Sequence, residues 1–190
     1  MRKLVLSFIV IVSVLSASAQ RASEMDVTWH NSDDFARSGV FAEVAAGWYN
    51  GEWLESNGLG LSLHIGYRYN LFDNFCWDAI KVGINDNVSD FGGYLDIRFL
   101  TGVRYYFGSL PSGNPFYINA YIGYQKAKDS YYWGVGSGLA YEGGIGVCIS
   151  ERSSLGLCWE GSSGRIEGGY WNNSCTSNWG LLALKLGFQF

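Results

Sequence analysis

The chain has 190 residues and a formal net charge of −4, with 13 basic and 17 acidic residues. Its length suits one domain, and an acidic balance without a basic cluster argues against nucleic acid as a partner and against a polybasic membrane anchor. Aromatic residues make up 17% of the chain, which has 26 glycines but only two prolines. This composition is typical of many strands joined by tight turns and excludes a disordered or helical protein.

The first 19 residues have the three parts of a secretory signal peptide. Arg2 and Lys3 precede an apolar run from Leu4 to Leu15, and small residues follow in an A-x-A pattern up to Ala19. We therefore expect cleavage after Ala19 and export from the cytoplasm. An uncleaved anchor is the alternative, but the apolar run is short for a membrane span.

The remaining chain divides into a short polar segment and a long region of alternating polarity. Residues 20–38 are polar and aperiodic, so we expect an N-terminal extension outside the folded domain. Residues 39–190 alternate with a period of two, which indicates strands that are apolar on one face only. Eight strands are expected, at residues 39–49, 58–70, 75–84, 94–107, 116–126, 137–149, 154–163 and 179–190.

The third expected strand, 75–84, is less regular than the others. Ile80, Val82 and Ile84 belong on its apolar face, which turns Lys81 to the polar face but leaves Asp78 on the apolar one. We place Asp78 near the membrane boundary, where a charge costs little. A bulge in this strand is the alternative.

The last strand carries a continuous apolar face up to the final residue, an aromatic. Such a strand seldom closes a soluble domain, whereas a membrane-spanning barrel must close with one. Aromatic residues also gather near the ends of other strands, where interfacial girdles are expected. They are Trp48, Tyr49, Tyr67, Tyr69, Tyr105, Tyr106, Phe107, Phe188 and Phe190.

The connections between strands alternate in length. The long ones fall at residues 50–57, 85–93, 127–136 and 164–178, and the short ones at 70–74, 108–115 and 150–153. Long loops on one side and short turns on the other are typical of outer-membrane barrels. The sequence therefore predicts an all-β fold, an eight-stranded antiparallel up-and-down transmembrane β-barrel over residues 39–190.

The strand face opposite the apolar one combines small residues with charges of both signs. This combination is typical of a narrow polar lumen. A buried charge is tolerable there only in a satisfied network. The residues expected in this lumen network are Glu43, His64, Arg68, Lys81, Asp96, Arg98, Arg104, Glu142, Glu160 and Lys185, with Lys185 a partner for Glu43 across the closing seam. The alternative is a soluble, lipocalin-like ligand-binding barrel, for which Gly47-Trp48-Tyr49 offers a faint G-x-W motif.

Several segments resemble the small outer-membrane β-barrels of Gram-negative bacteria, the OmpA-barrel or OmpX-like type often labelled porin family. They are the signal peptide, the alternating strands, "GVRYYFG", "NPFYINAYIGY" and the terminal "LKLGFQF". The resemblance implies an outer-membrane location with lipid as the surroundings, and insertion by the barrel-assembly machinery. In that family the machinery reads the last strand and its terminal aromatic, so Phe188 and Phe190 are the expected assembly signal.

Few residues are candidates for chemistry. His64 lies two residues after Ser62 on the same strand face, so a lipid-modifying hydrolase is one hypothesis; a lumen histidine hydrogen-bonded to Ser62 or a carboxylate is the preferred one. No cysteine pair has metal-ligand spacing, whereas Cys148 and Cys158 flank a short turn on one strand face and are candidates for a disulfide. We expect no enzyme activity, no catalytic, metal or cofactor site and no cofactor.

The expected function is a structural or surface-interaction role of a monomeric outer-membrane protein. A small low-conductance pore is the second hypothesis. Eight strands leave an interior just wide enough for side chains to fill, which argues against a diffusion pore for nutrients, but the small residues of the inner face could leave water-filled cavities. The long aromatic-rich loops 127–136 and 164–178 are candidates for binding an extracellular ligand.

Overall fold

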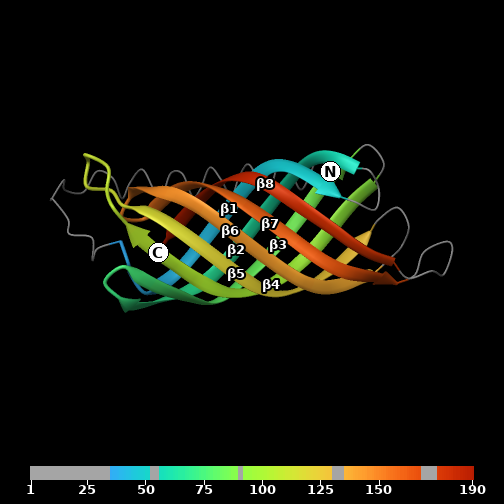
Figure 1. Cartoon of the computed structure of the whole chain (residues 1–190), viewed down its shortest axis with the longest axis horizontal. Helices are drawn as coiled ribbons and strands as arrows, with labels where there is room; N and C mark the ends of the chain where they lie inside the picture. The colour runs from blue at the N-terminus through green and yellow to red at the C-terminus, as the bar shows by residue number, and fades with distance from the viewer. Residues whose placement is uncertain (1–34, 52–55, 90–91, 130–134, 168–174) are drawn as a thin grey trace.

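The computed structural model describes residues 35–51, 56–89, 92–129, 135–167 and 175–190. Eight antiparallel strands follow one another around a single closed barrel, each paired with its neighbours in the sequence, and the last pairs with the first. Figure 1 shows the strands crossing the barrel wall obliquely, with the C-terminus at the same end as the short turns. The strands are β1 (Gly39–Gly51), β2 (Ser56–Phe72), β3 (Phe75–Ser89), β4 (Gly92–Phe107), β5 (Phe116–Asp129), β6 (Val135–Ser150), β7 (Ser153–Glu167) and β8 (Cys175–Gln189).

This architecture confirms the predicted fold class, although the strands are longer than expected. β3, for example, continues to Ser89 rather than ending at residue 84. Backbone pairing continues into the polar residues beyond the apolar face, because a ladder hydrogen bond does not depend on side-chain polarity. Parts of each expected long loop are therefore strand, and what remains of the loops at 52–55, 90–91, 130–134 and 168–174 lies outside the described residues, as does the predicted signal peptide.

The three short connections lie where the sequence placed them. The β4–β5 turn is the longest of them, and Gly108 and Gly113 adopt φ values of 53° and 86° there, which residues with a Cβ atom rarely tolerate. Two backbone hydrogen bonds join Leu110 and its neighbours Gly113 and Asn114 across this turn. The barrel closes at the same end, where the amide of Phe190 donates to the carbonyl of Val40.

The strand register fixes the stagger of the barrel. A path that follows paired residues once around the wall leaves β1 at Phe41 and returns to β1 at Gly51, ten residues further along. A shear of ten over eight strands corresponds to a tilt of about 43° and an interior that side chains can fill. Within the described residues, no helix is long and apolar enough to cross a membrane.

Large apolar side chains cover the outside of the barrel. Leu182 and Leu184 of β8 are 53% and 60% exposed, and every other strand has the same outward apolar series. The soluble lipocalin-like alternative needs an apolar interior, and this arrangement is the reverse of it. Exposed aromatic rings form a contiguous group near the short-turn end on β2 to β5, in which Tyr69 stacks on Trp77 and Phe107 on Phe116.

Two of the aromatic residues assigned to the girdles point inward instead. Tyr49 and Tyr106 are 8% and 2% exposed and belong to buried clusters in the lumen. The reason is the period of two: Trp48, Tyr105 and Phe107 face outward, so the residues between or beside them must face the interior. Proximity to a strand end therefore does not by itself place an aromatic residue at the membrane interface.

Candidate functional site: the charged lumen

Among the described residues, ten charged side chains lie in the interior of the barrel, and all of them are buried. Five are cations and five are carboxylates. Each of the eight strands contributes to the polar interior, since even β5, which supplies no charge, directs Asn119, Tyr121 and Gln125 inward. Nine of the ten charged residues, together with His64, are the residues expected there from the sequence: Glu43, Arg68, Lys81, Asp96, Arg98, Arg104, Glu142, Glu160 and Lys185.

Asp78 is the tenth, and its predicted outward position is wrong. It is 0% exposed, and the guanidinium of Arg68 donates to both carboxylate oxygens at 2.6 and 2.8 Å. A bulge explains the difference: Tyr67 pairs with Ile80 while Arg68 pairs with Asp78, so Ala79 is an extra residue in β3. The extra residue changes the parity of the strand and lets Ile80 face outward while Asp78 faces inward.

The bulge has its own hydrogen-bond support from β4. The hydroxyl of Thr101 donates to the carbonyl of Asp78 at 3.2 Å, and the indole of Trp77 donates to the Thr101 oxygen at 3.1 Å. Inside the barrel, the Tyr121 hydroxyl donates to Asp78 at 2.5 Å. The carboxylate therefore has a paired guanidinium and a phenol, which is the condition for burying a charge at tolerable cost.

A second group of charges fills the middle of the lumen. The ammonium of Lys81 donates to Glu43 and Glu142 at 2.6 Å each, and Lys185 contacts Glu142 as well. Lys185 also lies 3.4 Å from Glu43, the pair expected across the closing seam. Arg104 donates to the other oxygen of Glu43 at 2.5 Å. Three cations and two carboxylates from five strands thus form one connected network.

Glu160 of β7 links this network to the long-loop end of the lumen. It accepts hydrogen bonds from Ser62 at 2.9 Å and from the Asn85 amide at 3.0 Å. Arg98, which pairs with Asp96 at 3.0 Å, lies 3.5 Å from Glu160. The charges are therefore paired along the lumen rather than gathered in one patch.

His64 does not have the hydrogen bond expected for it. Its ring is buried, neither nitrogen has a hydrogen-bond partner among the described residues, and Nε2 lies 3.8 Å from Glu160. Ser62 donates to Glu160 rather than to His64. The carboxylate therefore stands between the serine and the histidine, which is the wrong order for a histidine that activates a serine nucleophile.

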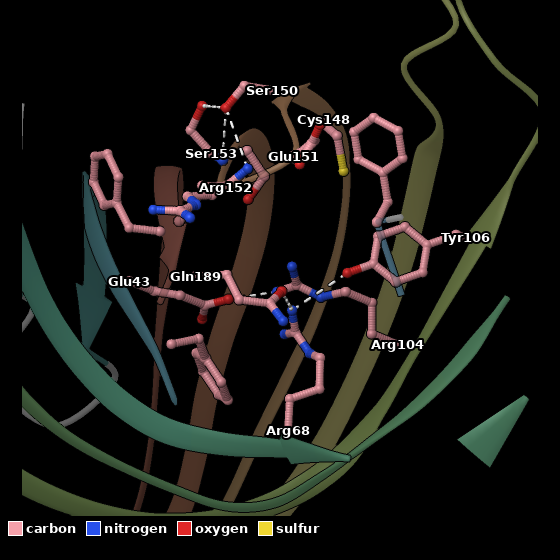
Figure 2. Close-up of a pocket in the computed structure, with 15 residues that line it drawn as sticks. Glu43, Arg68, Arg104, Tyr106, Cys148, Ser150, Glu151, Arg152, Ser153 and Gln189 are labelled. Atoms are coloured by element: carbon pink, nitrogen blue, oxygen red, sulfur yellow. Dashed lines mark hydrogen bonds and ion pairs between the residues drawn. The ribbon is translucent and has the colours of Figure 1, made fainter. Parts of the chain in front are cut away.

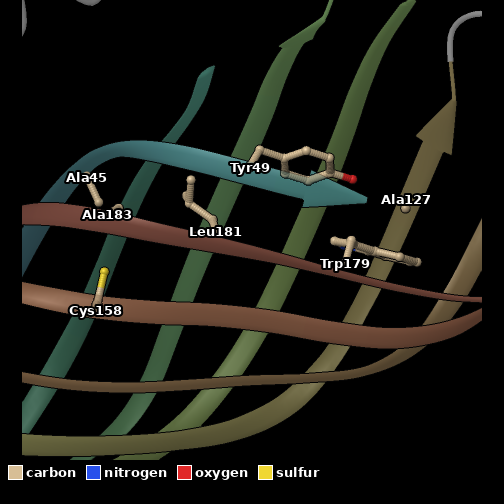
Figure 3. Close-up of a cluster of buried hydrophobic side chains, with 7 residues drawn as sticks. All are labelled: Ala45, Tyr49, Ala127, Cys158, Trp179, Leu181 and Ala183. Carbon is tan, nitrogen blue, oxygen red and sulfur yellow. The ribbon is translucent and has the colours of Figure 1, made fainter. Parts of the chain in front are cut away.

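Apolar and aromatic groups close the lumen on both sides of the charges. Toward the long-loop end a cluster lines the inner faces of β1, β5, β7 and β8, and Figure 3 shows Tyr49, Trp179 and Ala127 toward one end of it. Aromatic rings also cover the cations: Arg68 lies 4.7 Å from the ring centre of Phe41, Lys81 4.2 Å from Tyr121 and Arg104 4.3 Å from Tyr117.

The residues just before β1 contribute to the closure at the short-turn end. Phe35 and Ala36 are 6% and 1% exposed and pack in one buried cluster with Cys76, Tyr106, Tyr117 and Cys148. The segment is fixed by an ion pair from Arg37 to Glu151 at 3.2 Å and by the Gln189 amide, which donates to the carbonyl of Arg37 at 2.7 Å. The expected boundary of the extension at residue 38 is therefore wrong for residues 35–38, which belong to the folded domain.

A small pocket remains beside this segment (Figure 2). Its wall includes Arg68, Arg104 and Gln189, and its floor is the ion pair between Arg104 and Glu43. A second, smaller pocket lies at the other end, beside Tyr49 and Arg98. The paired charges between them separate the two pockets.

The predicted disulfide is absent, and Cys148 and Cys158 are both free and buried. The register gives the reason: Cys148 pairs with Ser154, while Cys158 pairs with Gly144. The two cysteines are thus four residues apart along the ladder, about 13 Å at the rise of a strand, whereas a disulfide needs Cα atoms within about 7 Å.

Three of the buried residues, Glu43, His64 and Glu142, offer ligand atoms within 4.8 Å of one another, as a metal site would. Lys81, however, already donates to both carboxylates from this position. A divalent cation would meet the charges of Lys81 and Lys185 at close range, so the arrangement favours the ion pairs over a metal.

The fold and the lumen together define a class: an eight-stranded barrel of the transmembrane type, apolar outside and filled with paired charges inside. The comparisons agree with this class. No protein-family model and no curated protein sequence matches the chain. Among solved structures, it is similar to Neisserial surface protein A, with 16% identity, a TM-score of 0.52, and 80% of this chain and 97% of that chain covered.

Two further structures show the same similarity. The outer membrane enzyme PagL matches with 12% identity and a TM-score of 0.50 over 78% of this chain and 99% of its own. Ail of Yersinia pestis matches with 15% identity and a TM-score of 0.45 over 80% and 97%. At these identities the likeness to Neisserial surface protein A and PagL shows the fold alone, and it confirms at that level the predicted resemblance to small outer-membrane barrels.

Proposed function

We propose that this protein is an integral barrel of the outer membrane of a Gram-negative bacterium, exported by the signal peptide over residues 1–19 and inserted by the barrel-assembly machinery. The observation that carries the proposal is the reversed polarity of a closed barrel, with apolar side chains outside and all ten buried charges inside. In water this arrangement would expose the apolar face of every strand, whereas in lipid it satisfies both faces.

Its role is structural or surface-interacting, and it acts as a monomer without a cofactor. The described lumen is filled by ion pairs from seven of the eight strands, so substrates have no path through it. The surfaces that remain available for function are the two ends of the barrel and its outer face. The segments 127–136 and 164–178, which the sequence predicts as long loops, remain the candidate region for binding an extracellular ligand.

A small pore is the alternative that keeps some structural support, because a pocket opens at each end of the lumen. Conduction would require the pairs of Lys81 and Lys185 with Glu142 to separate. Separating buried, paired charges costs several kcal/mol, by roughly the amount that breaking such a pair destabilises a protein. A steadily open channel is therefore disfavoured.

An enzyme is the weaker alternative. PagL is an outer membrane enzyme, but the likeness of this chain to PagL shows only the fold. Here the buried Ser62 and His64 face the lumen and share Glu160 rather than each other. A lipid substrate on the outside of the barrel would have no access to them.

Site-directed spin labelling tests the membrane location. A nitroxide on Leu184→Cys, with the native cysteines replaced by alanine, is compared with one on Arg152→Cys in the exposed β6–β7 turn. We expect the label at 184 to collide with oxygen but not with a water-soluble nickel chelate, and the label at 152 to collide with the nickel chelate.

The proposal would be overturned if the nickel chelate collided with the label at residue 184 as often as with the label at residue 152. Solubility of the purified protein without detergent, with one gel mobility before and after boiling, would overturn it equally. For the lumen, planar-bilayer recordings with no reproducible discrete conductance are expected, and steady conductance would favour the pore. An unchanged lipid A profile on deletion of the gene is expected for a protein without enzyme activity.

A further inference from the structure

The second pocket of the lumen, at its long-loop end, has walls of opposite polarity. Asn85 of β3 and the Asp96–Arg98 pair of β4 line it on one side. Tyr49 of β1 and Leu181 of β8 line it on the other side. A ligand held in this pocket would meet hydrogen-bonding groups on one face and apolar groups on the opposite face.

Two amide side chains on the polar side have unused hydrogen-bonding capacity. Asn85 is 7% exposed; its amide nitrogen donates to Glu160, and its Oδ1 has no hydrogen-bond partner among the described residues. Because only the nitrogen can donate to a carboxylate, the oxygen is the group left for the pocket. Gln125 of β5 is fully buried, and within the described part of the chain neither its Nε2 nor its Oε1 has a partner. Buried polar atoms without a partner are destabilising, so these two amides indicate a place that accommodates a hydrogen-bonding ligand.

The two amides lie at nearly the same depth in the barrel. Asn85 pairs with Asp96 in the β3–β4 ladder, and Gln125 pairs with Arg98 in the β4–β5 ladder. The shear of ten over eight strands raises a row of paired residues by about 1.25 residues per strand, so Asn85 and Gln125 are within about one residue of the same level. They stand on either side of β4 and can act on the same ligand.

The apolar side of the pocket is packed in place. A Cβ atom added to Gly60 of β2 would lie 2.6 Å from Cδ1 of Leu181 and 3.4 Å from Cβ of Tyr49, so both side chains close over this glycine. Tyr49 and Leu181 belong with Trp179 to the buried cluster of Figure 3. An aromatic ring opposite a few hydrogen-bonding groups suits a ligand with an apolar face and a polar edge.

The charges beside the pocket favour a neutral ligand. Arg98 lies 3.0 Å from Asp96 and 3.5 Å from Glu160, so these three groups already compensate one another. The groups with unused capacity are amides, which need both donors and acceptors from a ligand, and hydroxyl groups supply both. Asp86 also lines the pocket and is half-buried, so an amine is the competing ligand that the experiment must distinguish.

We propose that this mouth of the lumen binds a neutral sugar, whose hydroxyl groups hydrogen-bond to Asn85 and Gln125 while a face of its ring packs against Tyr49. The inference rests on the proposed surface-interaction role, because the membrane location turns the long-loop end away from the cell. The pocket is small, so a hydroxyl-bearing edge of the sugar enters it and the rest of the ring stays at the mouth. The hydroxyl groups replace the water that a polar pocket otherwise holds.

Saturation-transfer difference NMR of the full-length mature protein, folded in a zwitterionic detergent without a sugar headgroup, measures the binding. The probes are D-glucose, D-galactose and D-mannose, with D-glucosamine and D-glucuronate as charged analogues. We expect at least one neutral sugar to bind with a Kd of roughly millimolar order, as its size allows, and more tightly than either charged analogue. Asn85→Leu and Gln125→Met keep the side-chain volume but remove the amide, so each should weaken binding by about three- to tenfold.

Asn119→Leu is the matched control. Asn119 is a buried lumen residue of β5 like Gln125, and its Oδ1 also has no partner among the described residues, but it lies six residues nearer the short-turn end. Sugar affinity should not change in this variant. Gln125→Met should leave the midpoint of urea unfolding unchanged or higher, because the substitution removes no hydrogen bond from the protein.

The proposal would be overturned if the wild type bound no neutral sugar, if glucosamine bound more tightly than every neutral sugar, or if both amide variants kept the wild-type affinity. Weaker binding by Gln125→Met together with a lower unfolding midpoint would also overturn it, because the amide would then support the structure rather than the ligand. If the spin-label result at Leu184 holds while sugar binding is absent, the membrane location stands and only this inference fails.

Discussion

The buried pair of Arg68 and Asp78 makes a prediction that separates the bulged strand from a regular one. In the structure both side chains are almost inaccessible and share two hydrogen bonds of 2.6 and 2.8 Å. Removing one partner of such a pair leaves an uncompensated buried charge and typically costs about 3–5 kcal/mol. We therefore expect Arg68→Met to lower the free energy of unfolding by about that amount.

The substitution Asp78→Asn should have a similar cost, because Arg68 would keep only its hydrogen bonds to Tyr106 and Gln189. The double variant Arg68→Met/Asp78→Asn should be less destabilised than the sum of the two single changes, by about 2 kcal/mol or more, because no charge is then left unpaired. Urea unfolding in lipid vesicles, followed by the fluorescence of the eight tryptophans, measures all three.

The sign of the effect at Asp78 decides between the two strand geometries. A regular β3 would direct Asp78 to the lipid, and Asp78→Asn would then remove an outward charge and leave stability unchanged or higher. Additive single effects would refute the ion pair itself. Asp73→Asn, in the exposed β2–β3 turn six residues before Ala79, is the control and should stay within about 0.5 kcal/mol of the wild type.

Three further changes test other parts of the structure. In Gly83→Ala the new Cβ would lie 1.9 Å from the ring of His64, so we expect a loss of about 1–3 kcal/mol that His64→Ala partly restores; destabilisation that the second change leaves intact would contradict this packing. Phe35→Ala should uncover Cys148, so that maleimide modifies its thiol faster in the folded protein, and an unchanged rate would show that Phe35 does not close this end. Deletion of Phe190 should reduce the heat-modifiable, membrane-inserted fraction in cells if the terminal aromatic is read during assembly, while normal insertion would remove its role as a signal.

The alternation of polar and apolar residues was enough to predict the eight strands, their direction and the interior position of nearly every charge. A period of two assigns each side chain to a face without knowledge of its partners. This is why Lys81 and Lys185, unusual residues in a membrane span, could be placed in the lumen. The pairing of Lys185 with Glu43 followed from the single assumption that the first and last strands meet.

The predictions that were wrong concern features that shift the register of a strand or lie outside the strands. Ala79 shifts the parity of β3; the break in alternation at Asp78 indicated a bulge as an alternative, but it did not show that the charge faces the lumen rather than the membrane boundary. The offset of Cys148 and Cys158 depends on the register of a hairpin, which the turn sequence did not fix. Phe35 closes the barrel from a segment without periodicity, so its burial has no signal in the pattern.

The balance of charge inside the barrel bears on where its function can lie. Five cations and five carboxylates are paired within the described lumen, so the interior as a whole presents no net charge to attract an ion or a solute. Phe35 covers one end and Tyr49 and Trp179 narrow the other. An interior that is neutral, paired and covered stabilises the barrel without serving transport. The chemistry that remains available to a partner is then on the outer surface and at the two ends of the barrel.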